Sequence, residues 1–114
     1  MNYKIESALY IRSANNSRSS LESQRLKGEK YAKLNSISLS IIEDAPSSGF
    51  TPFNERSGLR RLVHLIEVGL INIVIVDSLI RISRDVNQIL SFVSLIDKHN
   101  AKLIVLDEAE VYRN

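Results

Sequence analysis

The chain contains no cysteine and no long apolar run. Without cysteine it cannot form a disulfide or a zinc–thiolate site, and it has no thiol nucleophile. No segment approaches the roughly 20 apolar residues that a membrane-spanning helix needs. The N-terminal stretch MNYKIES lacks the apolar core of a secretory signal. We therefore expect a cytoplasmic protein without membrane contact.

Residues that bind metal ions in other proteins are also sparse. The histidines His64 and His99 have no second ligand at a useful spacing, and we expect both to be solvated. Asp107, Glu108 and Glu110 form an acidic run, which we interpret as a solvated tail. The sequence therefore predicts no metal site.

The 114 residues are enough for one domain with its own core, but not for two. Apolar residues make up 44% and charged residues 25%, as in ordinary globular proteins. The formal net charge is only +2, so charge alone does not indicate nucleic-acid binding. That function has to be argued from where the arginines lie.

Apolar residues recur with two different spacings along the chain. Stretches of β-branched and apolar residues predict strands, and spacings of three and four predict helices. The strands are expected at 4–12, 37–42, 71–76 and 101–106, and the helices at 20–35, 59–68 and 86–96. This alternation, without a hairpin signal, predicts an α/β fold with a mostly parallel central sheet of four or five strands and helices on both faces.

Two arginines follow the most apolar of the predicted strands, Ile71–Val76. Arg81 and Arg84 lie near the predicted start of the next helix, which Ser83 or Asp85 can cap. A cation there is unfavourable by about 0.3–1 kcal/mol unless an anion is bound. Either both arginines point into water, or they form an anion site at the carboxyl end of a buried strand.

Four arginines are expected at the sheet edge where the carboxyl ends of parallel strands meet. Arg12 ends the first strand, Arg56 closes the long loop at 43–56, and Arg81 and Arg84 follow the third strand. A guanidinium group bonds two phosphate oxygens at once and keeps its charge. Together the four would stabilise the extra charge of a pentavalent phosphorus transition state. We favour this shared site over four separate surface arginines.

Three motifs at this edge resemble those of the serine recombinases, the group of resolvases, invertases and large serine integrases. Their Tyr-x-Arg-Val-Ser and Ser-Leu-acidic-x-Gln are matched by Tyr10-Ile11-Arg12-Ser13-Ala14 and Ser20-Leu21-Glu22-Ser23-Gln24. An acidic residue, Ser-Gly and Arg-x-Gly-Leu are matched by Asp44, Ser48-Gly49 and Arg56-Ser57-Gly58-Leu59. Leu-Asp-Arg-Leu-Ser-Arg-Asp is matched by Leu79-Ile80-Arg81-Ile82-Ser83-Arg84-Asp85. The resemblance covers nearly the whole chain, in the right order.

The resemblance implies a resolvase-like catalytic domain over residues 1–114, acting in DNA recombination and integration by mobile elements. In such enzymes a serine hydroxyl attacks a DNA phosphodiester and forms a 5′-phosphoserine, and the reverse attack rejoins the strands without metal or nucleotide. The motif positions that would hold the phosphate are Arg12, Arg56, Arg81 and Arg84, with Tyr10, Gln24 and Asp44 in support.

The family also implies particular partners. These are DNA and further copies of the chain, as a dimer and as a tetramer on DNA. Family members continue into a dimerisation helix and a separate DNA-binding domain, neither of which we expect within residues 1–114.

Two positions depart from the family pattern. The serine nucleophile falls at position 14, which is alanine here, and the aspartate before the first arginine of the third motif is Ile80. Ser13 is the nearest hydroxyl, but neighbouring side chains on a strand face opposite sides, so it serves only if the strand has ended or a bulge turns it. The following loop offers further hydroxyls, those of Ser17, Ser19 and Ser20. Otherwise the chain is a natural inactive relative, or Ala14 is an introduced change that traps a complex.

The sequence therefore indicates a serine-type site-specific recombinase whose activity depends on a substitute nucleophile. The alternative is an inactive resolvase-like module for protein or DNA interaction. A third reading is an α/β domain that binds another phosphorylated ligand at the same arginines. Arg12 and Arg81 on opposite faces of the sheet would argue against a shared site.

Overall fold

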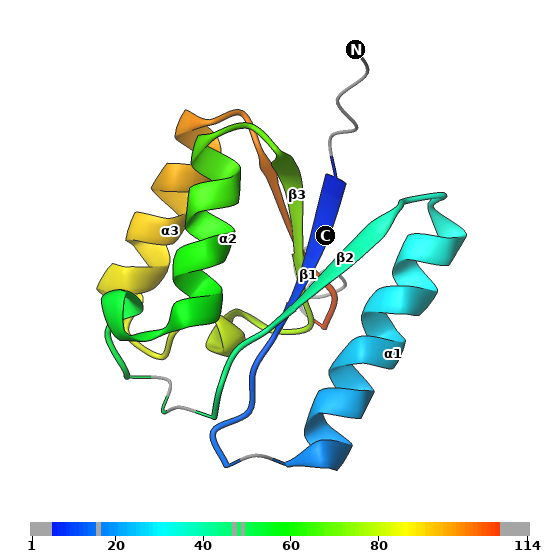
Figure 1. The fold of residues 1–114 in the computed structure, drawn as a ribbon, viewed down its shortest axis with the longest axis horizontal. Coiled ribbons are helices and arrows are strands. Elements are labelled where there is room, and N and C mark those ends of the chain that lie inside the picture. The colour runs from blue at the N-terminus through cyan, green and yellow to red at the C-terminus, as the bar shows by residue number, and fades with distance from the viewer. Residues whose placement is uncertain (1–5, 16, 47, 49, 108–114) are drawn as a thin grey trace.

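A computed structural model describes residues 6–15, 17–46, 48 and 50–107 (Figure 1). Strands and helices alternate as β1 (Glu6–Ile11), α1 (Arg18–Leu34), β2 (Leu39–Glu43), α2 (Ser57–Glu67), β3 (Ile71–Val76), α3 (Val86–Lys98) and β4 (Lys102–Val105). Two 3₁₀ turns, η1 (Phe53–Glu55) and η2 (Leu79–Arg81), precede α2 and α3. Gly49, Glu108 and Glu110, named above, lie outside the described residues, as do positions 4 and 5 of the first predicted strand.

The sheet has four strands, all parallel, in the order β2-β1-β3-β4. β1 lies in the interior, where Leu9 pairs with Ile41 of β2 and with Ile75 of β3. The α/β prediction is thereby confirmed. β3 has its predicted bounds, and the other predicted strands and helices begin and end within two residues of their predicted positions.

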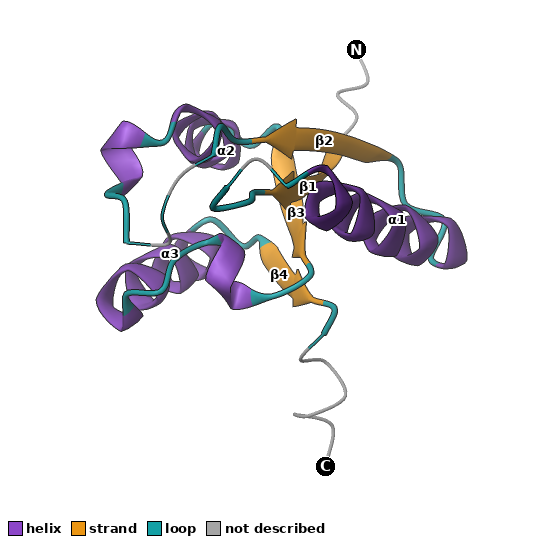
Figure 2. Ribbon diagram, turned by 90° about the horizontal axis from the view of Figure 1, so that it is seen from below, coloured by secondary structure: helices purple, strands orange, loops and turns teal. Residues whose placement is uncertain are grey.

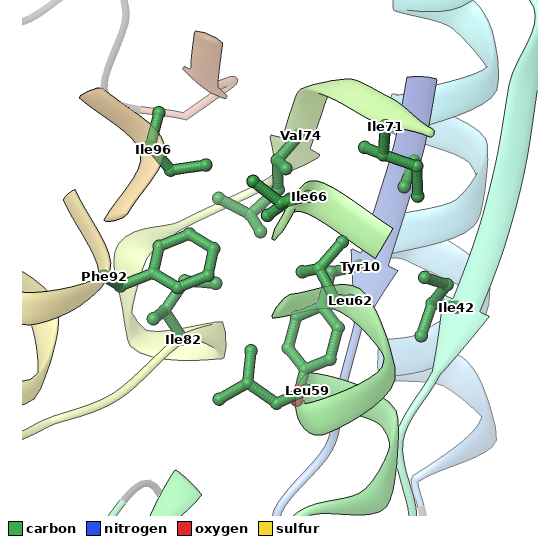
Figure 3. Close-up of a cluster of buried hydrophobic side chains, with 12 residues drawn as sticks. Tyr10, Ile42, Leu59, Leu62, Ile66, Ile71, Val74, Ile82, Phe92 and Ile96 are labelled. Carbon is green, nitrogen blue, oxygen red and sulfur yellow. The ribbon is translucent and has the colours of Figure 1, made fainter. Parts of the chain in front are cut away.

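Helices cover both faces of the sheet, with α1 on one face and α2 and α3 on the other (Figure 2). The cause is the alternation of side chains along β1. Leu9 and Ile11 enter the cluster under α1, whereas Ala8 and Tyr10 enter the cluster under α2 and α3. Figure 3 shows this second, larger cluster, in which Leu59, Leu62 and Ile66 of α2 lie opposite Phe92 and Ile96 of α3.

Local capping sets where α1 and α3 begin. The Ser17 hydroxyl accepts a hydrogen bond from the Ser20 amide at 3.2 Å, so α1 starts two residues before its predicted start. The Asp85 carboxylate accepts one from the Asn87 amide at 2.9 Å and caps α3, one of the two predicted caps. Arg81 ends η2 and does not lie at the start of α3. None of the described helices is long and apolar enough to cross a membrane.

Gly28 provides a test of how closely α1 approaches the sheet. A Cβ atom at Gly28 would lie 2.4 Å from Cδ2 of Leu9, which is fully buried in β1. We expect Gly28→Ala to lower the free energy of unfolding, because overpacking costs about 1–3 kcal/mol and the gain in helix propensity returns only about 1 kcal/mol. Urea unfolding measures the change.

The matched control is Ser23→Ala, at an exposed position of the same helix. It should leave the urea midpoint nearly unchanged. A Gly28→Ala protein as stable as this control would contradict the close approach.

Candidate functional site

Gln24 holds the residue that directly follows β1. Its side-chain amide donates to the Arg12 carbonyl, and its Oε1 accepts from the Arg12 amide, both at 3.0 Å. Gln24 is 1% exposed, so a buried side chain on α1 pairs with Arg12 much as a neighbouring strand would. The predicted supporting residue therefore fixes the backbone at Arg12.

Arg12 and Arg81 are linked in both directions. Nε of Arg12 donates to the Arg81 carbonyl at 2.9 Å, and Nη1 of Arg81 donates to the Arg12 carbonyl at 3.3 Å. Nη2 of Arg12 also donates to the Ile80 carbonyl. These bonds join the end of β1 to η2 across 69 residues of sequence. The two arginines therefore lie together and not on opposite faces of the sheet.

Asp77 fixes the guanidinium group of Arg81. Nε of Arg81 is 2.8 Å from Oδ1 of Asp77, and Nη2 is 3.2 Å from Oδ2, which is a bidentate ion pair. Asp77 directly follows β3 and is 3% exposed. Asp77 is not among the site residues predicted from the sequence. Its spacing of four residues from Arg81 and its place at a strand end were the available signals.

Arg56 lies deepest in the site, with its side chain fully buried. Its Nη atoms donate to the carbonyls of Ile82 and Arg81 and to the Tyr10 hydroxyl. Its guanidinium carbon lies 5.6 Å from the centre of the Tyr10 ring and 5.7 Å from that of Phe53. Backbone carbonyls, the Tyr10 hydroxyl and two aromatic rings therefore surround the Arg56 charge.

Asp44 caps α2 from a distant part of the chain. Its carboxylate accepts from the amides of Gly58 and Leu59 at 3.0 and 3.1 Å and from the Tyr10 hydroxyl at 2.7 Å. Oδ2 of Asp44 is 3.7 Å from Nε of Arg56. A Cβ atom at Gly58 would lie 2.8 Å from Cγ of Asp44, so only glycine allows this approach. Asp44 thereby links the end of β2 to the start of α2.

Burial and like charge shift two pKa values in the site. Burial raises the pKa of Tyr10 above its ordinary value, and the hydrogen bond to Asp44 acts in the same direction. Burial lowers the pKa of Arg12, and the positive charges of Arg56, Arg81 and Arg84 lower it further. The site therefore concentrates positive charge, which favours an anion.

The residues around the expected nucleophile form a turn of their own. The Ser13 hydroxyl accepts from the amides of Asn15 and Ser17 at 3.4 and 3.2 Å, and it donates to the Asn15 side chain at 3.1 Å. Ser13 is 4% exposed, whereas Ala14 is exposed. The Ser17 hydroxyl is the cap of α1. Position 14 is thus the accessible one, and it carries no hydroxyl.

Three of the four predicted arginines meet at the segment 80–82. Arg12 and Arg56 both donate to its backbone carbonyls, and Arg81 belongs to it. Arg84 is exposed beside them. Ile80, which stands where the family pattern has aspartate, contributes its carbonyl to Arg12. Among the described residues, no group of three or more histidines or carboxylates could hold a metal ion.

Comparison with known proteins places this arrangement in a family. The family model for the N-terminal domain of resolvases matches residues 7–114. The chain belongs to the resolvase N-terminal domain family. No curated protein sequence gives a significant match.

Solved structures agree with the resolvase assignment. The N-terminal catalytic domain of TP901-1 integrase is 29% identical, with a TM-score of 0.83 over 91% of this chain and 79% of that one. A resolvase-family site-specific recombinase from Streptococcus pneumoniae is 25% identical, with a TM-score of 0.76 over 92% and 74%. The C-terminal catalytic domain of ISC1926 TnpA, an IS607-like serine recombinase, shares the fold at 22% identity and a TM-score of 0.80 over 90% and 70%. This resolvase-family domain is therefore a module of the serine-type site-specific recombinases.

Tyr10 links Asp44 to Arg56, and its removal tests that link. Tyr10→Phe leaves one carboxylate oxygen and one guanidinium nitrogen short of a partner, so we expect the free energy of unfolding to fall by about 1–3 kcal/mol. Because the folded state raises the pKa of Tyr10, the wild-type domain should also lose stability as the pH rises above about 10, where the unfolded chain releases the phenolic proton first.

Urea unfolding at pH 8 and at pH 10.5 measures both effects. The Tyr10→Phe domain should show a smaller loss between the two pH values than wild type. Tyr31→Phe, a half-buried tyrosine of α1, is the matched control. Equal alkaline losses in wild type and Tyr10→Phe would contradict the linkage.

Proposed function

We propose that this resolvase-family domain binds the phosphate backbone of DNA at the arginine edge of the sheet and does not cut it. The proposal rests on one observation: arginines cluster at this edge, and the accessible residue at the end of β1 is an alanine. Arg12, Arg56 and Arg81 converge on one segment, and Ala14 occupies the accessible position at the end of β1.

The charge balance of the site supports phosphate as the ligand. Four arginines lie at this edge, and the ion pairs among the described residues give carboxylate partners to two of them, Asp44 to Arg56 and Asp77 to Arg81. Burial and the neighbouring positive charges both lower the pKa of Arg12, and a bound anion would offset the repulsion between these charges. Guanidinium groups suit a phosphodiester because they match its oxygens in pairs.

The absence of cleavage follows from the chemistry of position 14. A methyl group cannot attack phosphorus, and the neighbouring Ser13 hydroxyl is engaged with the amides of its own turn. An attack by Ser13 would require this turn to open and α1 to lose part of its starting structure. We therefore prefer an inactive recombinase module to an enzyme with a substitute nucleophile.

Family membership supports a further part of the proposal. The domain would act together with further copies of itself on DNA, as a dimer or a tetramer. Its proposed location is the cytoplasm. Its role would be to occupy or organise recombination sites, whereas an active relative would exchange the strands.

Restoring a hydroxyl at position 14 tests the missing nucleophile. With labelled, nicked DNA duplexes of varied sequence, we expect Ala14→Ser to form a covalent protein–DNA adduct on a denaturing gel and wild type to form none, because only the variant can form a phosphoserine. Ser13→Ala in the Ala14→Ser background is the control and should still form the adduct, because Ser13 shapes the turn and does not attack the phosphate.

Two results would contradict this account. An adduct formed by wild type and lost in Ser13→Ala would establish Ser13 as a substitute nucleophile. No adduct from Ala14→Ser would mean that the site lacks more than the hydroxyl.

Salt dependence tests the phosphate contact. We expect Arg84→Gln to weaken DNA binding several-fold and to reduce the slope of log affinity against log salt by about 1, because one phosphate contact is lost. Lys30→Gln removes the same charge from an exposed position of α1 and should change the slope little. Fluorescence anisotropy over a salt series measures both, and equal slopes for the two variants would argue against a site at Arg84.

A further inference from the structure

Three consecutive backbone carbonyls, those of Ile80, Arg81 and Ile82, point toward the interior at the end of η2. Arg12 donates to the first two, and Arg56 donates to the second and third. Buried carbonyls without a donor are costly, and no nearby backbone amide replaces these donors in the hydrogen bonds described. The segment 80–82 therefore depends on two guanidinium groups supplied by β1 and by the loop before α2.

The surroundings of Arg56 leave it no route to a ligand in solvent. Its side chain is fully buried, between the rings of Tyr10 and Phe53. Both of its Nη atoms are already engaged within the domain, and its buried Nε has no hydrogen-bond partner. To contact a DNA phosphate, Arg56 would have to break its hydrogen bonds to the carbonyls of Arg81 and Ile82.

The segment that these guanidinium groups hold carries the more accessible arginines. Arg81 keeps 19% of its side chain exposed, and Arg84 is exposed. Asp77 fixes the direction of Arg81 from the other side. The position of both arginines relative to solvent therefore depends on the carbonyls of 80–82.

We propose that Arg56 is a positioning residue that, together with Arg12, builds the segment 80–82 through its carbonyls, and that Arg81 and Arg84 meet the phosphate while Arg56 does not. This differs from a site in which all four arginines hold the anion. The part that concerns the phosphate rests on the proposed function, and the part that concerns the carbonyls does not.

Rescue by free guanidinium tests the carbonyl part without DNA. Arg56→Ala should lower the thermal midpoint and leave a cavity lined by the same acceptors. Guanidinium chloride at about 10–50 mM, far below the molar concentrations that unfold proteins, should raise the midpoint of this variant relative to equal sodium chloride. Wild type and Arg84→Ala should show no such rise, because neither has the cavity.

Arg56→Lys covers the case in which Arg56→Ala does not fold. Lysine keeps the charge but cannot span the separated acceptors, so its midpoint should fall between wild type and Arg56→Ala. A Lys variant with the wild-type midpoint would overturn the proposal. So would an Arg56→Ala protein that folds normally or that gains nothing from guanidinium.

DNA affinity then tests the phosphate part. For the Arg56 variants, the affinity should follow the folded fraction, and guanidinium should restore it in Arg56→Ala to within about twofold of wild type in equal salt. Arg84→Ala should stay several-fold weaker although it is fully folded. A folded Arg56→Lys protein that loses affinity as Arg84→Ala does would overturn the assignment. If wild type binds no DNA, the proposed function fails while the guanidinium result still decides the role of Arg56.

Discussion

The buried guanidinium group of Arg56 is the interaction on which the carboxyl edge of this domain depends. It contacts β1 through the Tyr10 hydroxyl and the 80–82 segment through two carbonyls, and it lies near the Asp44 carboxylate that caps α2. Burying a charge is expensive unless it is paired and hydrogen-bonded, and removing one partner of such a group costs about 3–5 kcal/mol. Three separate segments of the chain are therefore fixed by a single side chain. The apolar clusters hold the helices against the sheet, and this polar network fixes the segments at its carboxyl edge.

The fold could be predicted from the sequence because each element has a local cause. The apolar run of β3, broken only by Asn72, and the periodic spacing in α2 correspond to the observed elements. The site could be predicted only as far as its location. Strand polarity put Arg12, Arg56 and Arg81 at one edge, but it could not tell that Arg12 and Arg56 turn inward to backbone carbonyls. That direction depends on the path of residues 80–82, which no spacing reveals. Asp77 was not predicted for a related reason. Its partner Arg81 lies four residues later, but the residues between them do not form an α-helix, so helical spacing does not reveal the pair.

The turn between β1 and α1 is held by local hydrogen bonds, whereas the arginines join distant segments. Its hydroxyl groups are used locally: that of Ser13 closes the turn, and that of Ser17 starts the helix. A serine that caps a backbone amide is already committed as an acceptor. The residue left free for chemistry by this arrangement is the one at position 14, and there the chain has a methyl group. The domain thus keeps an accessible position at this turn but lacks a reactive hydroxyl there.

The interior position of β1 has a consequence for how the domain forms. The bonds that define the site join residues 69, 46 and 34 positions apart, and the complete set links β1 to segments that follow β2 and β3. Contacts between residues so distant in sequence are slow to form, because the chain must first lose the entropy of closing long loops. We therefore expect the arginine edge to form late in folding, after the strands that carry its residues have paired.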